Sequence, residues 1–468
     1  MEGPKRMKSL LEDLVAKSHG FLEVRYHKRT SNAFTVQKGR VDVANNSVNV
    51  GVGVRALIDG VWGFASTSDL SPSGLERAVA MAQANSKALL KIKGKGDVSL
   101  SRGRLSTVDF TGEGVSEILN MSLSDKLSQI VQFEKELADT STKIQTAKCR
   151  YNELLEEKIV VTSDGASCQM RFVQPEVSLM AIAEAAGSQI SGYKSAGVNG
   201  GWKCLYAHPA LENLVESTAQ LAIDLLSAKY PQGGKKKVIL APTVVGLLCH
   251  EAVGHTVEAD FVKSGSVAQG KIGQVVASPL VNMKDSGCEN LAGYAVGNQP
   301  FDDEGVSTET TSIIEKGKLV SYLHNRETAK EFGVAPTGNA RAWLYDDEPI
   351  IRMRNTYMEP GEQKLEDMIG EMDDGYLVDG AGGGQADANG EFMFGCGHVW
   401  HIKNGQKKEL LREATLSGIA FDVLKTVDAV SQEFQWDLGT GYCGKGQPAK
   451  VDAGGPYVRC DIHVGGRS

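Results

Sequence analysis

Two histidines and a glutamate lie within six residues of one another in the stretch C-H-E-A-V-G-H, residues 249–255. Imidazole nitrogens are common zinc ligands, and a carboxylate directly after the first histidine can serve as general base for a water molecule. The zinc pattern H-E-x-x-H places its two histidines four residues apart on one helical face. His250 and His255 are instead five residues apart, so the stretch predicts a metal site only under a further condition.

That condition is a local distortion of the helix. Five steps of about 100° leave the rings of His250 and His255 about 140° apart on a regular α-helix. A π-bulge adds one residue to a turn and returns both rings to one face, and Gly254 is the residue expected to tolerate it. On spacing alone, the alternative is two unrelated histidines near a helix. Cys249 lies on neighbouring backbone and is predicted to point into the core.

The elements that must position this stretch follow from hydrophobic spacing, which predicts a helix over about residues 244–257 after a strand at 237–240. In the first half of the chain, helices are expected at 7–17, 72–90, 124–137 and 209–228, and strands at 21–28, 32–38, 41–46, 48–58, 62–65, 146–154, 158–162 and 169–184. Towards the C-terminus, strands are expected at 312–316, 319–324, 376–378, 392–403 and 408–414, and helices only at 326–331 and 417–427.

These elements predict an α+β fold in two parts. Residues 1–232 are expected to form an N-terminal mixed α/β domain with an antiparallel sheet and flanking helices. Residues 233–468 are expected to form a predominantly β domain that carries the metal-binding helix. The boundary is placed at G-G-K-K-K, residues 233–237, where the composition changes. A length of 468 residues suits two or three domains, and 53 glycines favour a β-rich architecture with many tight turns.

Composition excludes several classes of protein. The net charge of -8 gives no general attraction to nucleic acid or anionic membranes. No apolar run reaches the roughly 18 residues that a membrane span needs, and acidic residues interrupt the apolar ones near the N-terminus, which argues against a signal peptide. The eight cysteines are scattered without a C-x-x-C pair. This usage predicts reduced thiols and a cytoplasmic location.

The stretch H-E-A-V-G-H-x-x-E-x-D, residues 250–260, resembles the metal motif of the TldD/PmbA family, also called modulator of DNA gyrase. Further segments resemble the family in the same order, namely G-V-G-V-R-A (51–56), G-x-x-G-F-A-S-T (60–67), F-D-D-E-G-V (301–306), T-G-N-A-R (337–341), P-I-I-R-M-R-N-T-Y-M-E-P-G (349–361), G-G-G-Q (382–385), E-A-T-L-S-G (413–418) and G-Y-C-G-K (441–445). The chain keeps H-E-x-x-x-H. It therefore resembles the TldD-type catalytic subunit, whereas the PmbA or TldE type lacks this motif.

The resemblance implies a zinc metallopeptidase whose metal ligands are His250, His255 and Cys443, with Glu251 as general base. Without the resemblance, Cys443 would be read as another buried thiol. Family members hydrolyse small or unfolded peptides and trim leader peptides. They bind the peptide extended beside a strand, and they pair two subunits around an enclosed chamber. We therefore expect a homodimer, or a heterodimer with a PmbA/TldE-type subunit, without contact to nucleic acid or membrane.

Two other functions compete with the peptidase. In one, the chain is a non-catalytic peptide-binding or scaffold subunit of a TldD/PmbA-like complex. The intact set of His250, Glu251, His255 and Cys443 argues against it. In the other, the chain regulates DNA topology by contacting DNA, which the net charge of -8 does not favour.

Several charged residues near these motifs have two open interpretations. Glu258 and Asp260 either orient the histidines as hydrogen-bond acceptors or are solvated charges at a helix end. Arg352 and Arg354 share one face of a predicted strand, where they hold either a peptide carboxylate or a structural partner.

Other polar residues are expected to be structural. The acidic cluster Asp302, Asp303 and Glu304 is expected to be a turn with capping side chains. His324, His398 and His401 are placed on strands, and the last two face opposite sides of theirs.

Overall fold

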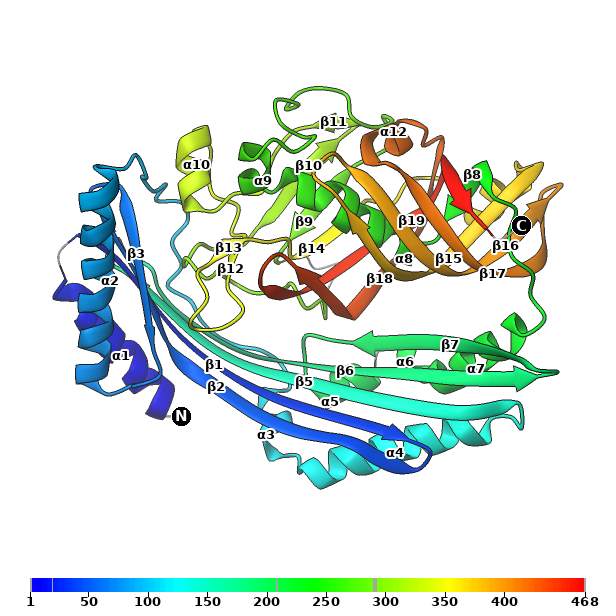
Figure 1. Ribbon diagram of the computed structural model, residues 1–468, viewed down its shortest axis with the longest axis horizontal. Helices are drawn as coiled ribbons and strands as arrows, with labels where there is room; N and C mark the ends of the chain where they lie inside the picture. The colour runs from blue at the N-terminus through cyan, green and yellow to red at the C-terminus, as the bar shows by residue number, and fades with distance from the viewer. Residues whose placement is uncertain (1, 19, 208, 289–292, 467–468) are drawn as a thin grey trace.

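The computed structural model describes residues 2–18, 20–207, 209–288 and 293–466, which form two stacked layers (Figure 1). A long, curved sheet from the N-terminal half of the chain lies beneath a second, more tightly coiled sheet from the C-terminal half (Figure 1). The fold is α+β, as predicted. No helix within the described residues is long and apolar enough to cross a membrane.

The lower layer is a seven-stranded sheet within the described residues, in the order β3-β2-β1-β5-β6-β4, with β7 also paired to β6. Its strands are β1 (Phe21–Gln37), β2 (Arg40–Ile58), β3 (Val61–Thr67), β4 (Asp109–Thr111), β5 (Ile144–Thr162), β6 (Ser167–Ala185) and β7 (Ser188–Gly197). Neighbours run antiparallel except β4, which runs parallel to β6. The sequence did not predict β7.

The strands of this sheet are longer than predicted. Four short strands, at 21–28, 32–38, 41–46 and 48–58, are expected where β1 and β2 run through. In the structure Ser31 pairs with Ser47 and Asn32 with Asn46, and the Asn46 amide donates to the Asn32 side-chain oxygen. Polar side chains satisfied across a strand pair do not interrupt the ladder.

Helices cover the two ends of the curved sheet (Figure 1). They are α1 (Glu2–Ala16), α2 (Pro72–Lys93), α3 (Val115–Asn120), α4 (Leu123–Asp139), α5 (Trp202–Tyr206), α6 (Pro209–Glu212) and α7 (Leu214–Leu225). The predicted start of α2 is confirmed, because the Ser71 hydroxyl accepts from the Gly74 N–H and Pro72 occupies the first turn. The single helix expected at 209–228 is wrong, since the structure has two helices separated by Asn213.

The upper layer is a ten-stranded sheet within the described residues, in the order β11-β10-β9-β14-β19-β17-β16-β15-β8, with β18 paired to β19. Its strands are β8 (Gly234–Leu240), β9 (Met283–Ser286), β10 (Thr310–Glu315), β11 (Lys318–Leu319), β14 (Asn355–Met358), β15 (Asp374–Ala386), β16 (Glu391–Lys403), β17 (Gln406–Ile419), β18 (Ala429–Gly444) and β19 (Pro448–Gly465). A further pairing of β8 with β19 closes β8, β15, β16, β17 and β19 into a ring.

The predicted metal-binding helix packs against this ring. Its segments are α8 (Pro242–Leu247), a π-helix η1 (Leu248–Gly254) and a 3₁₀ turn η2 (His255–Val257). The remaining elements are α9 (Ala259–Lys263), α10 (Arg326–Phe332), α11 (Leu365–Gly370), α12 (Ala420–Lys425) and a small ladder of β12 (Ala340–Arg341) and β13 (Ile350–Ile351). Val244, Val245 and Leu248 are fully buried in the main C-terminal core with side chains of the surrounding strands. The helix is therefore held rigidly from several sides.

Three expectations for the C-terminal half are wrong. No strand was predicted beyond residue 427, yet β18 and β19 are among the longest in the sheet. The helix expected at 417–427 begins only at Ala420, because the preceding residues complete β17. The strand expected at 319–324 ends at Leu319.

The acidic turn at residues 302–304 joins the two layers. Asp302 Oδ1 accepts from the backbone N–H groups of Glu304 and Val306, so the expected capped turn is confirmed. Asp303 lies 2.9 Å from Lys158 Nζ of β5, and Glu304 lies 2.8 Å from Arg55 of β2. The turn thus adds buried ion pairs between the layers, which the sequence did not predict.

Candidate metal centre

The helix that carries the two histidines is distorted between them. The backbone N–H of His255 donates to the carbonyl of His250, five residues back, which is the hydrogen bond of a π-helix. The π segment spans Leu248–Gly254. The distortion that the five-residue spacing requires is thereby confirmed.

Gly254 has a different role from the one expected. Its φ of -54° and ψ of -49° are ordinary helical values that any residue adopts. A Cβ atom at this position would lie 1.9 Å from the Met353 sulfur and 3.2 Å from the Cys249 carbonyl oxygen. The position requires glycine because Met353 occupies the space beside it.

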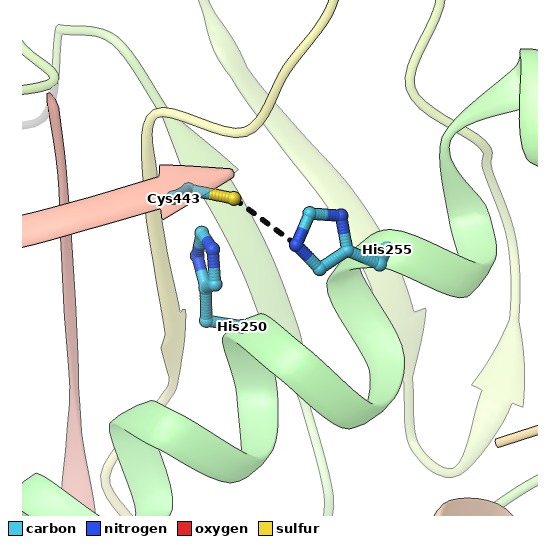
Figure 2. A group of neighbouring side chains, drawn as sticks. All are labelled: His250, His255 and Cys443. Carbon is cyan, nitrogen blue, oxygen red and sulfur yellow. Dashed lines mark hydrogen bonds between the residues drawn. The ribbon is translucent and has the colours of Figure 1, made fainter. Parts of the chain in front are cut away.

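Cys443, near the end of β18, meets the two histidines at one point (Figure 2). Its Sγ lies 3.0 Å from Nε2 of His255, and one ligand atom from each of the three residues lies within 4.8 Å of the others. The rings of His250 and His255 are 5.2 Å apart between centroids and nearly perpendicular. Within the described residues, no other group of histidine, cysteine and carboxylate side chains converges in this way.

The donor set fits a zinc ion. His250 is 4% exposed, and neither of its ring nitrogens has a hydrogen-bond partner within the described residues. A buried imidazole without partners is costly unless another group satisfies it. Donor atoms bound at 2.0–2.3 Å in a tetrahedral shell lie roughly 3.5 Å apart, a value between the 3.0 Å contact of Cys443 with His255 and the 4.8 Å limit of the group. Two imidazoles and one thiolate also leave a fourth position open.

The electrostatics favour the ligand form of Cys443. Burial would raise the pKa of this thiol, but the neighbouring imidazoles of His250 and His255 lower it to about 4. Burial would likewise lower the pKa of His255, but hydrogen bonds with Cys443 and Glu258 raise it to about 10. The sulfur is thus a thiolate at neutral pH, and the thiolate is the form that binds metals.

Glu251 lies at the edge of this group. Its carboxylate oxygens are 3.7 Å from Nε2 of His255 and 4.0 Å from Nε2 of His250. Its side chain is 23% exposed, more than either histidine. A carboxylate at this distance can reach a water molecule beside the donor atoms without displacing a ligand.

A carboxylate orients the second histidine. Oε2 of Glu258, which is fully buried, lies 3.0 Å from Nδ1 of His255. Burial would raise the pKa of Glu258, but the bonds from His255 and Lys445 hold it below its usual range. Of the two interpretations left open for Glu258, the structure supports the hydrogen-bond acceptor that orients His255. Asp260 bonds to Lys445 and not to a histidine.

The arginines left open are also structural. Arg352 donates from Nη1 to the carbonyl of Gln447 and from Nη2 to that of Cys443. Arg354 donates to the carbonyl of Gly338. Both are 1% exposed, so neither presents a free charge to a peptide. Arg352 nevertheless matters to the site, because it fixes the backbone on which the cysteine lies.

The three other histidines that the sequence placed on strands do not belong to this group. His398 is 3.6 Å from Asp379 and His401 is 2.9 Å from Asp374, on opposite faces of β16. His324 is buried, bonds to Thr328 and lies beyond the end of the short strand β11. Cys249 is fully buried in the core, as predicted.

Comparison with known proteins agrees with this geometry. Three family models match the chain: PmbA/TldA metallopeptidase domain 1 over residues 22–86, the central domain over 116–226 and the C-terminal domain over 233–466. The three matched models describe domains of a metallopeptidase. The chain belongs to the PmbA/TldA metallopeptidase family, as the motifs predicted.

Relatives and solved structures extend over the whole chain. A metalloprotease of Methanocaldococcus jannaschii is 32% identical, with 94% of this chain and 95% of that protein covered. A zinc metalloprotease TldD homolog of Saccharolobus solfataricus is 25% identical, with 95% and 96% covered. Two crystal structures share the fold, each with a TM-score of 0.79. A putative modulator of DNA gyrase from Thermotoga maritima is 22% identical, with 98% of this chain and 100% of that chain covered. TldE from Thermococcus kodakarensis is 19% identical, with 97% of this chain and 99% of that chain covered.

Proposed function

We propose that this chain is a zinc-dependent peptidase of the TldD type that hydrolyses peptide bonds in small or unfolded peptides, including leader peptides. The observation that carries the proposal is the convergence of His250, His255 and Cys443 beside Glu251 at one point of the structure. The name of one relative, a zinc metalloprotease, supports the choice of metal.

Each residue of the group has a proposed role. His250, His255 and Cys443 would hold the ion, and Glu258 keeps the Nδ1 proton of His255 so that Nε2 faces the centre. When bound, zinc supplies Lewis-acid chemistry and makes water acidic enough to lose a proton near pH 7. Glu251 takes the proton of the attacking water and delivers it to the amine that leaves.

The proposed substrate is an extended chain rather than a folded protein. Backbone hydrogen bonds to a strand edge give affinity with little sequence preference, which suits the trimming of unfolded segments. The fold shared with TldE supports assembly as a homodimer or with a TldE-type subunit. We place this activity in the cytoplasm, because all eight cysteines are free thiols.

The test compares the wild-type chain with Glu251→Gln in cleavage of an unstructured peptide, with and without a TldE-type partner. We expect cleavage by the zinc-loaded wild type, loss of activity with a chelator, and at least a roughly hundredfold lower rate for Glu251→Gln. Zinc content measured by metal analysis should be equal in both proteins, because Glu251 is not a ligand.

Glu315→Gln is the matched control, since Glu315 is an exposed glutamate on β10. It should cleave at the wild-type rate. Full activity of Glu251→Gln would remove this residue as the base. A wild-type protein that binds peptides but cleaves none, with zinc and partner present, would instead establish the non-catalytic scaffold.

A further inference from the structure

Lys445 lies two residues after Cys443, and its side chain is only 10% exposed. Its Nζ donates to Oε2 of Glu258 at 3.0 Å, to Asp260 at 2.8 Å and to the carbonyl of Ile351 at 3.0 Å. It also lies 4.2 Å from the centre of the Phe261 ring. All three hydrogen bonds of the ammonium group are thus made to protein atoms.

The carboxylate oxygen that Lys445 contacts is the one that orients the metal-site histidine. Oε2 of Glu258 faces Nδ1 of His255 at 3.0 Å and Nζ of Lys445 at 3.0 Å. Because Glu258 is fully buried, its position depends on these two partners. Removing the ammonium group would leave a buried carboxylate with one partner and freedom to turn away from the ring.

Lys445 also connects the two segments that supply the candidate ligands. It follows the strand of Cys443, while Glu258 and Asp260 follow the helix of His250 and His255. Lys445 thus links the strand of Cys443 to the histidine segment through Glu258 and Asp260. The side chain of Arg352, next to β13, holds the same strand by its bonds to the backbone carbonyls of Cys443 and Gln447.

We propose that Lys445 is a positioning residue of the metal centre. It holds Glu258 against His255 and keeps the strand of Cys443 at the distance where sulfur and both imidazoles bind one ion. This inference rests on the proposed function only in taking His250, His255 and Cys443 as the ligands.

The test is metal retention in the full-length chain, with cleavage activity measured separately. Lys445→Met removes the ammonium group but keeps the length of the side chain, and Lys445→Arg restores a positive charge. Each zinc-loaded protein is titrated with a competing chelator, and the melting temperature of each metal-free protein is recorded. Cobalt(II) replaces zinc in a parallel series, where the visible spectrum reports thiolate coordination.

Lys126→Met is the matched control. Lys126 is also buried, contacts a carboxylate of Glu153 at 2.7 Å and a backbone carbonyl at 3.4 Å, and belongs to the N-terminal layer. Its loss should lower the melting temperature without changing metal retention. The pair of variants thus separates loss of a buried ion pair from loss of a positioning contact.

We expect Lys445→Met to bind zinc about 10–100-fold more weakly than the wild type, with a weaker cobalt–thiolate band. Lys445→Arg should recover part of both. Equal retention by Lys445→Met and Lys126→Met would overturn the inference and leave Lys445 as a structural ion pair. If Lys445→Met does not fold, Lys445→Gln replaces it, and wild-type zinc affinity and cobalt spectrum in Lys445→Gln would overturn the inference. A wild-type chain that binds no zinc would refute the proposed function itself.

Discussion

The pKa of Cys443 is shifted in the opposite direction from those of the other buried cysteines of the C-terminal core. Burial raises the pKa of Cys249, and it raises the pKa values of Cys396 and Cys460 to about 12, so these are inert thiols. For Cys443 the same burial is outweighed by the neighbouring imidazoles of His250 and His255, and the pKa falls to about 4. Of these four buried cysteines, Cys443 is the one whose thiol is deprotonated at neutral pH, the form that binds metals.

His324 predicts a pH dependence of stability. Burial lowers its pKa to about 4 from an ordinary value of 6.5, and no charged group compensates. As the pH falls from 6.5 towards 4, the unfolded chain takes up a proton that the folded chain refuses, so stability falls. Urea unfolding of metal-free protein should show a loss from pH 7 to pH 5 that is about 2 kcal/mol smaller in His324→Gln.

The comparison uses only how much the free energy of unfolding changes between pH 7 and pH 5 in each protein. Any effect of His324→Gln on stability that does not depend on pH therefore cancels. The same change with pH in wild type and His324→Gln would show that folding does not lower the pKa of His324.

At the scale of elements, the π segment makes the site possible. Its existence could be predicted, because two rings five residues apart can meet only on a distorted helix. The role of Gly254 could not be predicted, since Met353 lies about a hundred residues away and their contact depends on tertiary packing. The same holds for Cys443, which only the family motif identified, and for Glu258, whose two interpretations the fold decided.

Gly254→Ala should destabilise the protein. The added methyl group would collide with the sulfur of Met353, which is fully buried and has little room to move. We expect a loss of about 1–3 kcal/mol in the free energy of unfolding, measured with urea. Gly370→Ala is the control, because a Cβ there meets no atom within 4 Å.

A second substitution checks the cause. The double variant Gly254→Ala/Met353→Ala should lose less stability than the sum of the two single losses, because the colliding atom is absent. If the two losses simply add, the explanation by collision with Met353 fails.

Hydrophobic alternation predicted some strands of the fold and missed others. The hairpin turn at Asp59-Gly60 is confirmed, with positive φ at both residues. Strands β18 and β19 were not predicted, because glycines and polar residues such as those of Asp437–Gly444 give no regular alternation. Strand β19 pairs with β8, β14 and β17, and β18 pairs with β19; a single sequence contains no direct sign of such pairing.

At the scale of the molecule, buried charges hold the two layers together. Asp303 is 1% exposed and lies 2.9 Å from Lys158 and 3.8 Å from Arg25. Burial would raise its pKa, but these two cations hold it well below its usual range. The division of the chain at residue 233, by contrast, stays a prediction.

Asp303→Asn should strongly destabilise the contact between the layers. The variant keeps the shape of the side chain but removes the buried negative charge that pairs with Lys158 and Arg25, which costs about 3–5 kcal/mol. Urea unfolding against the exposed control Asp422→Asn measures the effect. A stability near that of the control would mean that hydrophobic packing alone joins the layers.

The central claim is that one zinc ion is bound by two imidazoles and the thiolate of Cys443. X-ray absorption at the zinc edge of the wild-type chain tests it most directly, together with metal analysis. We predict roughly one zinc per chain with a single sulfur at about 2.3 Å and nitrogen or oxygen at about 2.0 Å, and loss of the sulfur signal in Cys443→Ser. A first shell without sulfur in the wild type, or a chain that binds no zinc, would contradict the account.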